Sequence, residues 1–309
     1  MTLKATNSIE AMITSRDNKW LKSFRAALRG QHPEAQPQNG RAGAGSRTGE
    51  LLGIEGPKLV EEALRAGLEA EALLVSESGE REAQRILQAA SESESGIPQS
   101  RVFRTSDKLF AGVAGTESPQ GVAALFRQRE YAFEDILRGA GGVRQSLPLV
   151  IVLAAVQDPG NVGTILRSAE AFGATGAVAA RGTADPWSPK ALRASAGSAL
   201  RLPVMRGIAI PVLLAQLRVS GINIYGATSQ VSTAGRGLAP ETPEADLTEA
   251  CAIFVGNEGA GLPPEVEHAA DALISIPTSA VESLNAGVAG SIVLYEAARQ
   301  RRRQSQRGS

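Results

Sequence analysis

The first half of the chain alternates between segments with helical spacing of apolar residues and short apolar runs. Over residues 15–29 the apolar positions share one helical face, which predicts an amphipathic helix with Ser15 as its N-cap. Residues 31–49 are rich in Gly, Pro and Gln, so we expect a mobile loop there. Strands are then expected at 51–54, 71–76, 101–104 and 121–126, and helices at 57–66, 80–90 and 106–111. Residues 1–126 are therefore predicted to form a small α/β domain.

The second half is more apolar, and the amino-acid composition changes just before it. Residues 127–147 mix charges with glycines and are expected to be a linker. The run PLVIVLAAV that follows is typical of a strand buried on both faces. Strands are expected at 149–156, 176–180, 203–206, 222–227, 251–256 and 272–276. A last helix is expected from Ala286 to Arg301, on the face Val288, Ile292, Tyr295 and Ala298. Residues 148–309 are therefore predicted to form a doubly wound parallel sheet, which binds ligands beyond the carboxyl ends of its strands.

Length and composition agree with two domains of an ordinary globular protein. The chain has 309 residues, 43% of them hydrophobic, and contains no apolar run long enough to span a bilayer. The N-terminus lacks the pattern of a secretory signal, and Cys251 is the single cysteine. We therefore expect a cytoplasmic protein without disulfides, in which Cys251 is a small buried residue rather than a reactive thiol.

Metal chemistry is not expected from this sequence. The two histidines, His32 and His268, have no Cys or His partner at the spacing of metal ligands. We therefore predict no metal site and no catalytic triad that depends on histidine.

Basic residues gather at both ends of the chain, although the formal net charge is zero. They are Lys4, Arg16, Lys19, Lys22, Arg25 and Arg29 at the start, and Arg299, Arg301, Arg302, Arg303 and Arg307 at the end. Local basic patches can bind nucleic acid even when the net charge of the whole chain is zero. Termini that are simply exposed to solvent explain the two clusters equally well.

Three polar, glycine-bearing segments each follow a predicted strand of the second domain. In the first, residues 156–174, Asp158-Pro159-Gly160 forms a turn, and Asn161 is expected to cap the following helix. Arg167 lies one to two turns further on, so the two side chains are expected on the same side, where they could bind a phosphate. A capped helix with a surface arginine is the alternative interpretation.

The second segment, residues 254–266, reads FVGNEGAGLPPEV. Gly256, Gly259 and Gly261 permit positive φ and close approach of the backbone to a ligand, and Glu258 stands at the strand end. The segment matches neither the dinucleotide fingerprint nor the phosphate-loop motif. An ordinary glycine-rich turn remains the alternative.

The third segment, residues 276–299, reads IPTSAVESLNAGVAGSIVLYEAAR. Ser283, Leu284 and Asn285 stand just before the last predicted helix, where hydroxyl, amide and free backbone N–H groups converge. Helix capping accounts for Ser283 or Asn285, but it does not require both.

Together the three segments resemble the motifs of the SpoU/TrmH group of SPOUT RNA methyltransferases, over residues 148–300. The matching residues are Asn161, Gly163, Arg167, Phe172 and Gly173; Gly256, Asn257, Glu258, Gly261 and Leu262; and Ile276, Pro277, Ser283, Leu284 and Asn285. The stretch ALRASAGSALRLPV at 191–204 is similar to the family's connecting helix and strand. SRDNKWLKSF and GIEGPKLVEEAL resemble the L30e-like domain that precedes many of these enzymes, and the insertion at 31–49 departs from that domain's compact basic segment.

The resemblance implies an α/β architecture of a particular kind. The C-terminal part is expected to be a SPOUT-type parallel sheet with a deep trefoil knot, a rare exception to unknotted topology. A small α/β L30e-like domain is expected to precede it and to bind the RNA substrate. A homodimer is also implied, in which each active site is completed across the interface.

The resemblance further implies S-adenosyl-L-methionine-dependent methylation of a ribose 2′-hydroxyl in a structured RNA. The implied cofactor-binding residues are Thr228, Gly256, Asn257, Gly261, Ile276, Ser283, Leu284 and Asn285. The implied catalytic residues are Asn161, Arg167, Glu258, Ser283 and Asn285. The implied RNA-binding residues are Arg16, Asn18, Lys19, Lys22 and Lys58.

The pKa of an arginine guanidinium is too high for it to be an effective base, so Arg167 is not expected to accept the proton. Arg167 is therefore expected to grip a phosphate and stabilise the developing alkoxide, while Glu258 or a phosphate-linked water accepts the proton. A 23S-type ribosomal RNA is favoured as substrate because the first domain resembles a ribosomal protein. The alternatives are a tRNA 2′-O-methyltransferase and a non-catalytic RNA-binding assembly factor; a nucleotide-dependent enzyme is disfavoured because both phosphate-binding motifs are missing.

Overall fold

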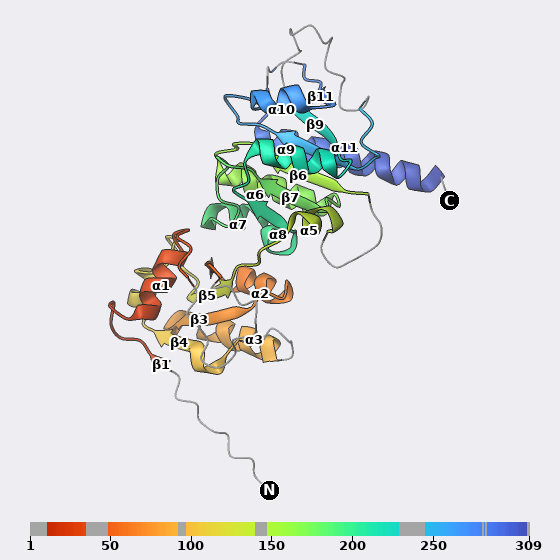
Figure 1. The fold of residues 1–309 in the computed structure, drawn as a ribbon. Coiled ribbons are helices and arrows are strands. Elements are labelled where there is room, and N and C mark those ends of the chain that lie inside the picture. The colour runs from red at the N-terminus through yellow and green to blue at the C-terminus, as the bar shows by residue number, and fades with distance from the viewer. Residues whose placement is uncertain are drawn as a thin grey trace. The chain divides into compact units, whose positions relative to one another are not determined.

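The computed structural model describes residues 11–34, 49–91, 97–139, 147–228, 245–279, 281 and 283–307. The chain divides into two compact units, Met1–Arg129 and Glu130–Ser309 (Figure 1). Most of the loop expected at 31–49, namely residues 35–48, lies outside the described residues.

The first unit is a five-stranded mixed sheet with helices on it. Its strands are β1 (Ala11–Met12), β2 (Leu51–Glu55), β3 (Ala70–Ser76), β4 (Val102–Thr105) and β5 (Val122–Arg127). Its helices are α1 (Lys19–Ala27), α2 (Pro57–Arg65), α3 (Glu80–Ser91) and α4 (Asp107–Ala111). The strand order is β1-β4-β3-β5-β2, with β5 antiparallel to both of its neighbours. Every helix and strand expected between 51 and 126 is confirmed to within a residue or two.

Helix α1 covers one face of this sheet and begins later than the sequence suggests. The prediction of Ser15 as its N-cap is wrong, because the side chain of Asn18 accepts a hydrogen bond of 2.8 Å from the Trp20 N–H. Trp20 packs against Phe103 of β4, with ring centroids 5.1 Å apart. At its other end the helix meets Gly53, where an added Cβ would lie 2.5 Å from the Ala27 carbonyl carbon. The missing side chain therefore lets α1 lie directly on β2.

The second unit is a six-stranded sheet in which every neighbouring pair is parallel, as expected. Its strands are β6 (Leu149–Leu153), β7 (Gly176–Ala179), β8 (Val204–Arg206), β9 (Asn223–Thr228), β10 (Cys251–Val255) and β11 (Ala272–Ser275). Its helices are α5 (Phe133–Arg138), α6 (Pro159–Ala171), α7 (Pro189–Ser195), α8 (Ser198–Arg201), α9 (Ile210–Val219), α10 (Pro264–Ala269) and α11 (Ala286–Arg307).

The strand order, β11-β9-β10-β6-β7-β8, places the ends of distant segments side by side. Strand β10 is inserted between β6 and β9, so that Val255 pairs with Leu153 on one side and with Ala227 on the other. On the next strand, Thr228 pairs with Ser275. The segments that follow β6, β9, β10 and β11 therefore leave the sheet at the same edge.

Part of the segment expected as a linker belongs to the second unit. Helix α5 buries Phe133 and Ile136 in the core that α9 and α10 share with one face of the sheet. Gly176 at the start of β7 lies against this helix, since an added Cβ would lie 2.8 Å from Ile136. Residues 130–139 are therefore not a free linker, and 140–146 lie outside the described residues.

Helix α11 packs against α6 through its small residues rather than its large ones. A Cβ at Gly290 would lie 3.1 Å from Ile165, which shows how closely the two helices approach. The predicted apolar face is wrong in this respect: Val288, Ile292 and Tyr295 are 46%, 37% and 49% exposed. Glycine permits the short interhelical distance, so Val288, Ile292 and Tyr295 are left on the outer side, while Val293 and Leu294 are buried.

Candidate active site

The first of the three segments begins with a capped helix, but the cap is not the residue expected. Asp158 Oδ1 accepts hydrogen bonds from the Gly160 and Asn161 N–H groups, and Pro159 is the first helical residue. Lys190 lies 2.8 Å from the other carboxylate oxygen, and its hydrogen bond holds the pKa of Asp158 below the usual value. The prediction that Asn161 caps α6 is therefore wrong, and its side chain is available for another contact.

That contact joins the first segment to the second. Asn161 Nδ2 donates a hydrogen bond of 2.7 Å to Oε1 of Glu258. Glu258 is exposed, and its second carboxylate oxygen has no hydrogen-bond partner among the described residues. The result is an oriented carboxylate with one oxygen open to a substrate, at the edge where β6 and β10 end.

The glycines of the second segment mainly shape the turn itself. Asn257 and Gly261 exchange two backbone hydrogen bonds, of 2.9 and 3.0 Å, which close the turn. A Cβ at Gly256 would lie 2.3 Å from the Gly261 carbonyl oxygen, and Gly261 itself has φ of +72°. The Asn257 side chain accepts from the N–H groups of Gly259 and Ala260. Glu258 thus stands at the tip of a rigid turn.

The third segment reaches the first at the start of α11. Asn285 caps this helix by accepting from the N–H groups of Gly287, at 2.9 Å, and Val288, at 3.2 Å. A Cβ at Gly287 would lie 3.2 Å from Asn161 Oδ1, so the helix start abuts the residue that holds Glu258. Asn285, Asn161 and Glu258 therefore gather at one place.

Two of the expected catalytic residues do not join this cluster. Arg167 is exposed on α6, and it makes no hydrogen bond or ion pair with any residue that the structure describes. Six positions correspond to about 240° around a helix, so Arg167 does not point to the same side as Asn161, contrary to expectation. Ser283 is exposed, and the described residues offer its hydroxyl no hydrogen-bond partner.

The residues expected to bind a cofactor lie on adjacent strand ends. Thr228 ends β9, Gly256 follows β10 and Ile276 follows β11, and the strand pairing brings these positions side by side. Ile276 and Leu284 are half-buried apolar residues. Backbone groups at strand ends, beside half-buried apolar side chains, suit a flat nucleoside, which needs hydrogen bonds at its edge and apolar contact on its faces. The donor set thus fits the adenosine part of S-adenosylmethionine.

In the first unit, only some of the expected RNA-binding residues lie together. Arg16, Lys19 and Lys22 are exposed around the start of α1, whereas Asn18 is occupied as the helix cap. Lys58 lies on α2, which packs with α3 rather than with α1. Arg16, Lys19 and Lys22 are therefore close together in the chain, and Lys22 lies 3.5 Å from the carboxylate of Asp17.

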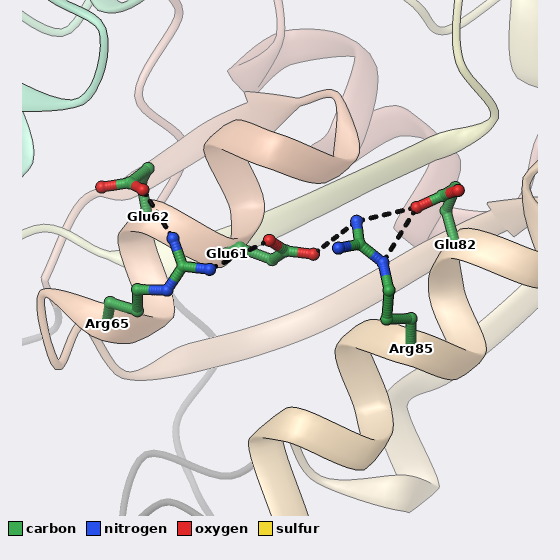
Figure 2. A network of polar contacts seen from close by, with 5 residues as sticks. All are labelled: Glu61, Glu62, Arg65, Glu82 and Arg85. Atoms are coloured by element: carbon green, nitrogen blue, oxygen red, sulfur yellow. Dashed lines mark hydrogen bonds and ion pairs between the residues drawn. The ribbon is translucent and has the colours of Figure 1, made fainter.

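The charges on the exposed side of α2 and α3 are balanced and largely paired with one another. Figure 2 shows the paired residues, Glu61, Glu62, Arg65, Glu82 and Arg85. Arg85 lies 2.7 Å from Glu61 and 2.8 Å from Glu82, so it links the two helices. This surface has no surplus of positive charge for phosphates.

The C-terminal basic cluster has partly structural roles. Arg301 donates to the backbone carbonyls of Leu147, Pro148, Leu247 and Glu249. Arg299 pairs with Glu296 at 2.6 Å. Arg301 thus fastens α11 to the amino ends of β6 and β10, whereas Arg299 forms an ion pair within α11, and neither role requires a nucleic acid.

Cys251 is buried, as expected, and burial raises the pKa of its thiol to about 11. Within the described ranges, no group of three or more His, Cys, Asp or Glu side chains could hold a metal ion. No helix there is sufficiently long and apolar for a transmembrane segment. Sequence reasoning missed Lys190 and Thr183, which border the site from α7 and from the segment after β7; no motif marks either of them.

Two family models match the chain. Residues 148–295 match the SpoU rRNA Methylase family, and residues 46–124 match the MRM3-like substrate binding domain. The first match covers the first two segments of the site and most of the third, and the second match covers most of the first unit.

Individual relatives agree with these matches. The chain is 34% identical, over 78% of its length and 86% of the relative's, to 23S rRNA (guanosine(2553)-2′-O)-methyltransferase RlmP of Bacillus subtilis. The AdoMet-bound rRNA methyltransferase of Sinorhizobium meliloti superposes with a TM-score of 0.71 at 27% identity, covering 93% of this chain and 97% of that one. The SpoU methyltransferase AviRb of Streptomyces viridochromogenes, in complex with AdoMet, gives a TM-score of 0.69 at 26% identity, with coverage of 93% and 100%.

Proposed function

Because the chain belongs to the SpoU rRNA methylase family, we propose that its RNA substrate is a ribosomal RNA and that Glu258 accepts the proton of the ribose 2′-hydroxyl. The chain is an S-adenosylmethionine-dependent RNA 2′-O-methyltransferase. The observation that carries the role of Glu258 is the hydrogen bond from Asn161, which fixes a carboxylate at the edge where the strands end. A ribosomal RNA substrate would place the enzyme in the cytoplasm.

The cofactor is assigned to the ends of β9, β10 and β11. Backbone groups at Thr228, Gly256, Ile276 and Leu284 would hold its adenosine, and the turn of Asn257 and Gly261 together with Ser283 and Asn285 would border it. When bound, S-adenosylmethionine supplies a methyl group already activated by its sulfonium. The protein must therefore mainly orient the ribose oxygen in line with that methyl group and take up one proton.

Glu258 is placed to take up the proton of the ribose hydroxyl. Its Oε1 is occupied by Asn161, and its Oε2 is open, so a ribose hydroxyl can donate to Oε2. A carboxylate oxygen accepts hydrogen bonds, so Oε2 can receive the hydroxyl proton as the methyl group is transferred. Proton transfer to a positioned base contributes roughly 10²–10⁴ in rate.

Arg167 is assigned two tasks, to bind a phosphate of the RNA and to stabilise the developing alkoxide. It would perform them in the active site of the partner subunit, across a dimer interface. It points away from Asn161 of its own chain and is exposed. The outer face of α11, formed by Val288, Ile292 and Tyr295, would pack against a second copy. Tyr295 contacts Phe172 at the end of α6, with centroids 5.6 Å apart, so this face adjoins the helix that carries Arg167. A homodimer would thus complete each site.

The first unit is proposed to be an L30e-like RNA-recognition domain, with Arg16, Lys19 and Lys22 on its basic surface. Its match to a substrate binding domain and its basic α1 support this role. We also propose that the second unit contains a deep trefoil knot. The insertion of β10 between β6 and β9 and the return of α11 onto α6 support it.

Methyl transfer to isolated RNA tests the proposal. Ribosomal and transfer RNA would be prepared from a strain that lacks the gene and incubated with the full-length protein and radiolabelled S-adenosylmethionine. Label in ribosomal RNA, at a 2′-O-methyl position found by mapping, is the expected result. Label confined to transfer RNA would contradict the substrate, and no label with S-adenosylmethionine bound would contradict the activity.

A further inference from the structure

Ala155, directly after β6, has a backbone conformation that alanine rarely adopts. Its φ is +63°, and Ala196 is the only other non-glycine residue in the described part of the chain with positive φ. The left-handed region costs free energy for a residue with a Cβ, and such residues persist only where their surroundings hold them. The surroundings of Ala155 should therefore contain the groups that hold it.

Thr183, from the segment after β7, is the first such group. Its Oγ1 accepts a hydrogen bond of 3.1 Å from the Ala155 N–H and donates one of 2.7 Å to the Leu153 carbonyl. The Ala184 N–H next to it donates to the Val156 carbonyl at 2.9 Å. One hydroxyl thus uses both its donor and an acceptor position to fix the end of β6.

Asn257, from the turn after β10, holds the other side of the same residue. Its Nδ2 donates to the Ala155 carbonyl at 3.0 Å, while its Oδ1 accepts from two N–H groups of its own turn. The peptide groups on both sides of Ala155 are therefore held by side chains from two other segments.

The segment that leaves Ala155 carries Asn161, and the turn that contains Asn257 carries Glu258. We infer that Thr183 is a positioning residue for methyl transfer, which together with Asn257 holds Ala155 in its left-handed conformation and so sets the contact between Asn161 and Glu258. This inference rests on the proposed role of Glu258. Thr183 lies outside the three motif segments, so the inference adds a new residue to the site.

The chain offers a matched control at the opposite end of β6. Thr175 Oγ1 accepts from the Leu149 N–H at 3.3 Å and donates to the Leu149 carbonyl at 3.2 Å. Thr175→Val therefore removes a similar pair of hydrogen bonds from the same strand, at the edge away from the site. Both Thr175→Val and Thr183→Val should lower Tm, because each leaves a backbone N–H without its partner.

The test compares single-turnover methyl transfer at saturating RNA and S-adenosylmethionine. Thr183→Val should lower this rate by about tenfold, the effect of roughly one lost hydrogen bond, with the cofactor Kd changed by less than about twofold. Thr183→Ser, which keeps the hydroxyl, should restore the rate. Thr175→Val should leave it within about twofold of wild type.

A second variant tests the backbone conformation itself. Glycine adopts positive φ without strain, so Ala155→Gly combined with Thr183→Val should regain at least about threefold of the lost rate. An unchanged rate in Thr183→Val, an equal rate loss in Thr175→Val, or no recovery in the double variant would overturn the inference. Wild-type protein that transfers no methyl group would instead overturn the proposed function.

Discussion

Asn161 and Glu258 are 97 positions apart in the chain, and the amide of the first donates a hydrogen bond of 2.7 Å to the carboxylate of the second. The contact exists because β6 and β10, which precede the two residues, are neighbours in the sheet. It orients a carboxylate that pairs with no other residue in the described part of the chain, at the edge where both strands end.

Glu258→Gln should abolish most of the chemistry and spare binding. The amide keeps the size of the side chain but cannot take up a proton at neutral pH, so the single-turnover rate should fall by about 10²–10⁴. Isothermal titration should give unchanged affinities for S-adenosylmethionine and RNA. Glu265→Gln, on the exposed first turn of α10, removes the same charge and serves as the control. A wild-type rate in Glu258→Gln would assign the proton to another acceptor.

Arg167→Ala should slow methyl transfer even when RNA is saturating. A guanidinium that stabilises developing negative charge contributes roughly 10²–10³ to the rate, whereas one that only holds RNA affects affinity. Single-turnover rates at increasing RNA concentration separate the two. Should the rate at saturation equal that of wild type, the arginine contributes to binding alone.

Replacing Arg16, Lys19 and Lys22 by Gln should weaken RNA binding and its salt dependence. Each lost phosphate contact reduces the slope of log K against log salt by about 0.7–0.9. The control replaces Arg65 and Arg85, which Figure 2 shows, and the exposed Arg81 of α3 by Gln, which removes as much positive charge from α2 and α3. Filter binding at several salt concentrations should show a change only in the α1 variant; equal changes in both would indicate a general charge effect.

Ile292→Asp should convert a dimer to a monomer and reduce methyl transfer. A carboxylate in an apolar interface loses its hydration without gaining a partner. Light scattering coupled to gel filtration gives the mass. Val219→Asp is the control, because Val219 is 90% exposed on α9, which covers the other face of the sheet. A wild-type protein that runs as a monomer would contradict the proposed interface.

Cys251 should resist alkylation in the folded protein. Burial raises the pKa of its thiol to about 11, so at pH 8 almost no thiolate is present. This raised pKa stabilises the fold below about pH 8.5, the ordinary thiol pKa, and the contribution is lost as the pH rises towards 11. Iodoacetamide followed by mass spectrometry should label the protein only after unfolding in guanidinium. Rapid labelling of native protein would show that the thiol is accessible.

Most elements of the fold could be predicted from the sequence because they depend on local patterns. The run at 149–153 is apolar throughout and forms a strand buried on both faces. Cap positions were harder to predict. Asp158 and Asn161 are both good N-cap residues within one turn of each other, and only the helix start at Pro159 decides between them.

The meeting of the three segments could be predicted better than the contacts between their side chains. The three segments do meet at one edge of the sheet, but the pairing of Asn161 with Glu258 depends on strand order, which periodicity does not encode. The outward face of α11 could not be predicted either. Hydrophobicity favours burying Val288 and Ile292, whereas the close approach permitted by Gly287 and Gly290 determines which side faces α6.

The place of β10 between β6 and β9 also has a consequence for synthesis of the chain. About 100 residues separate the paired positions Leu149 and Cys251, so β6 emerges from the ribosome long before its inner neighbour exists. At roughly 5–20 residues per second, one edge of an apolar strand waits about 5–20 s without its partner. Unpaired strand edges promote aggregation. Nascent chains halted before residue 251 should therefore be the most aggregation-prone intermediates of this protein.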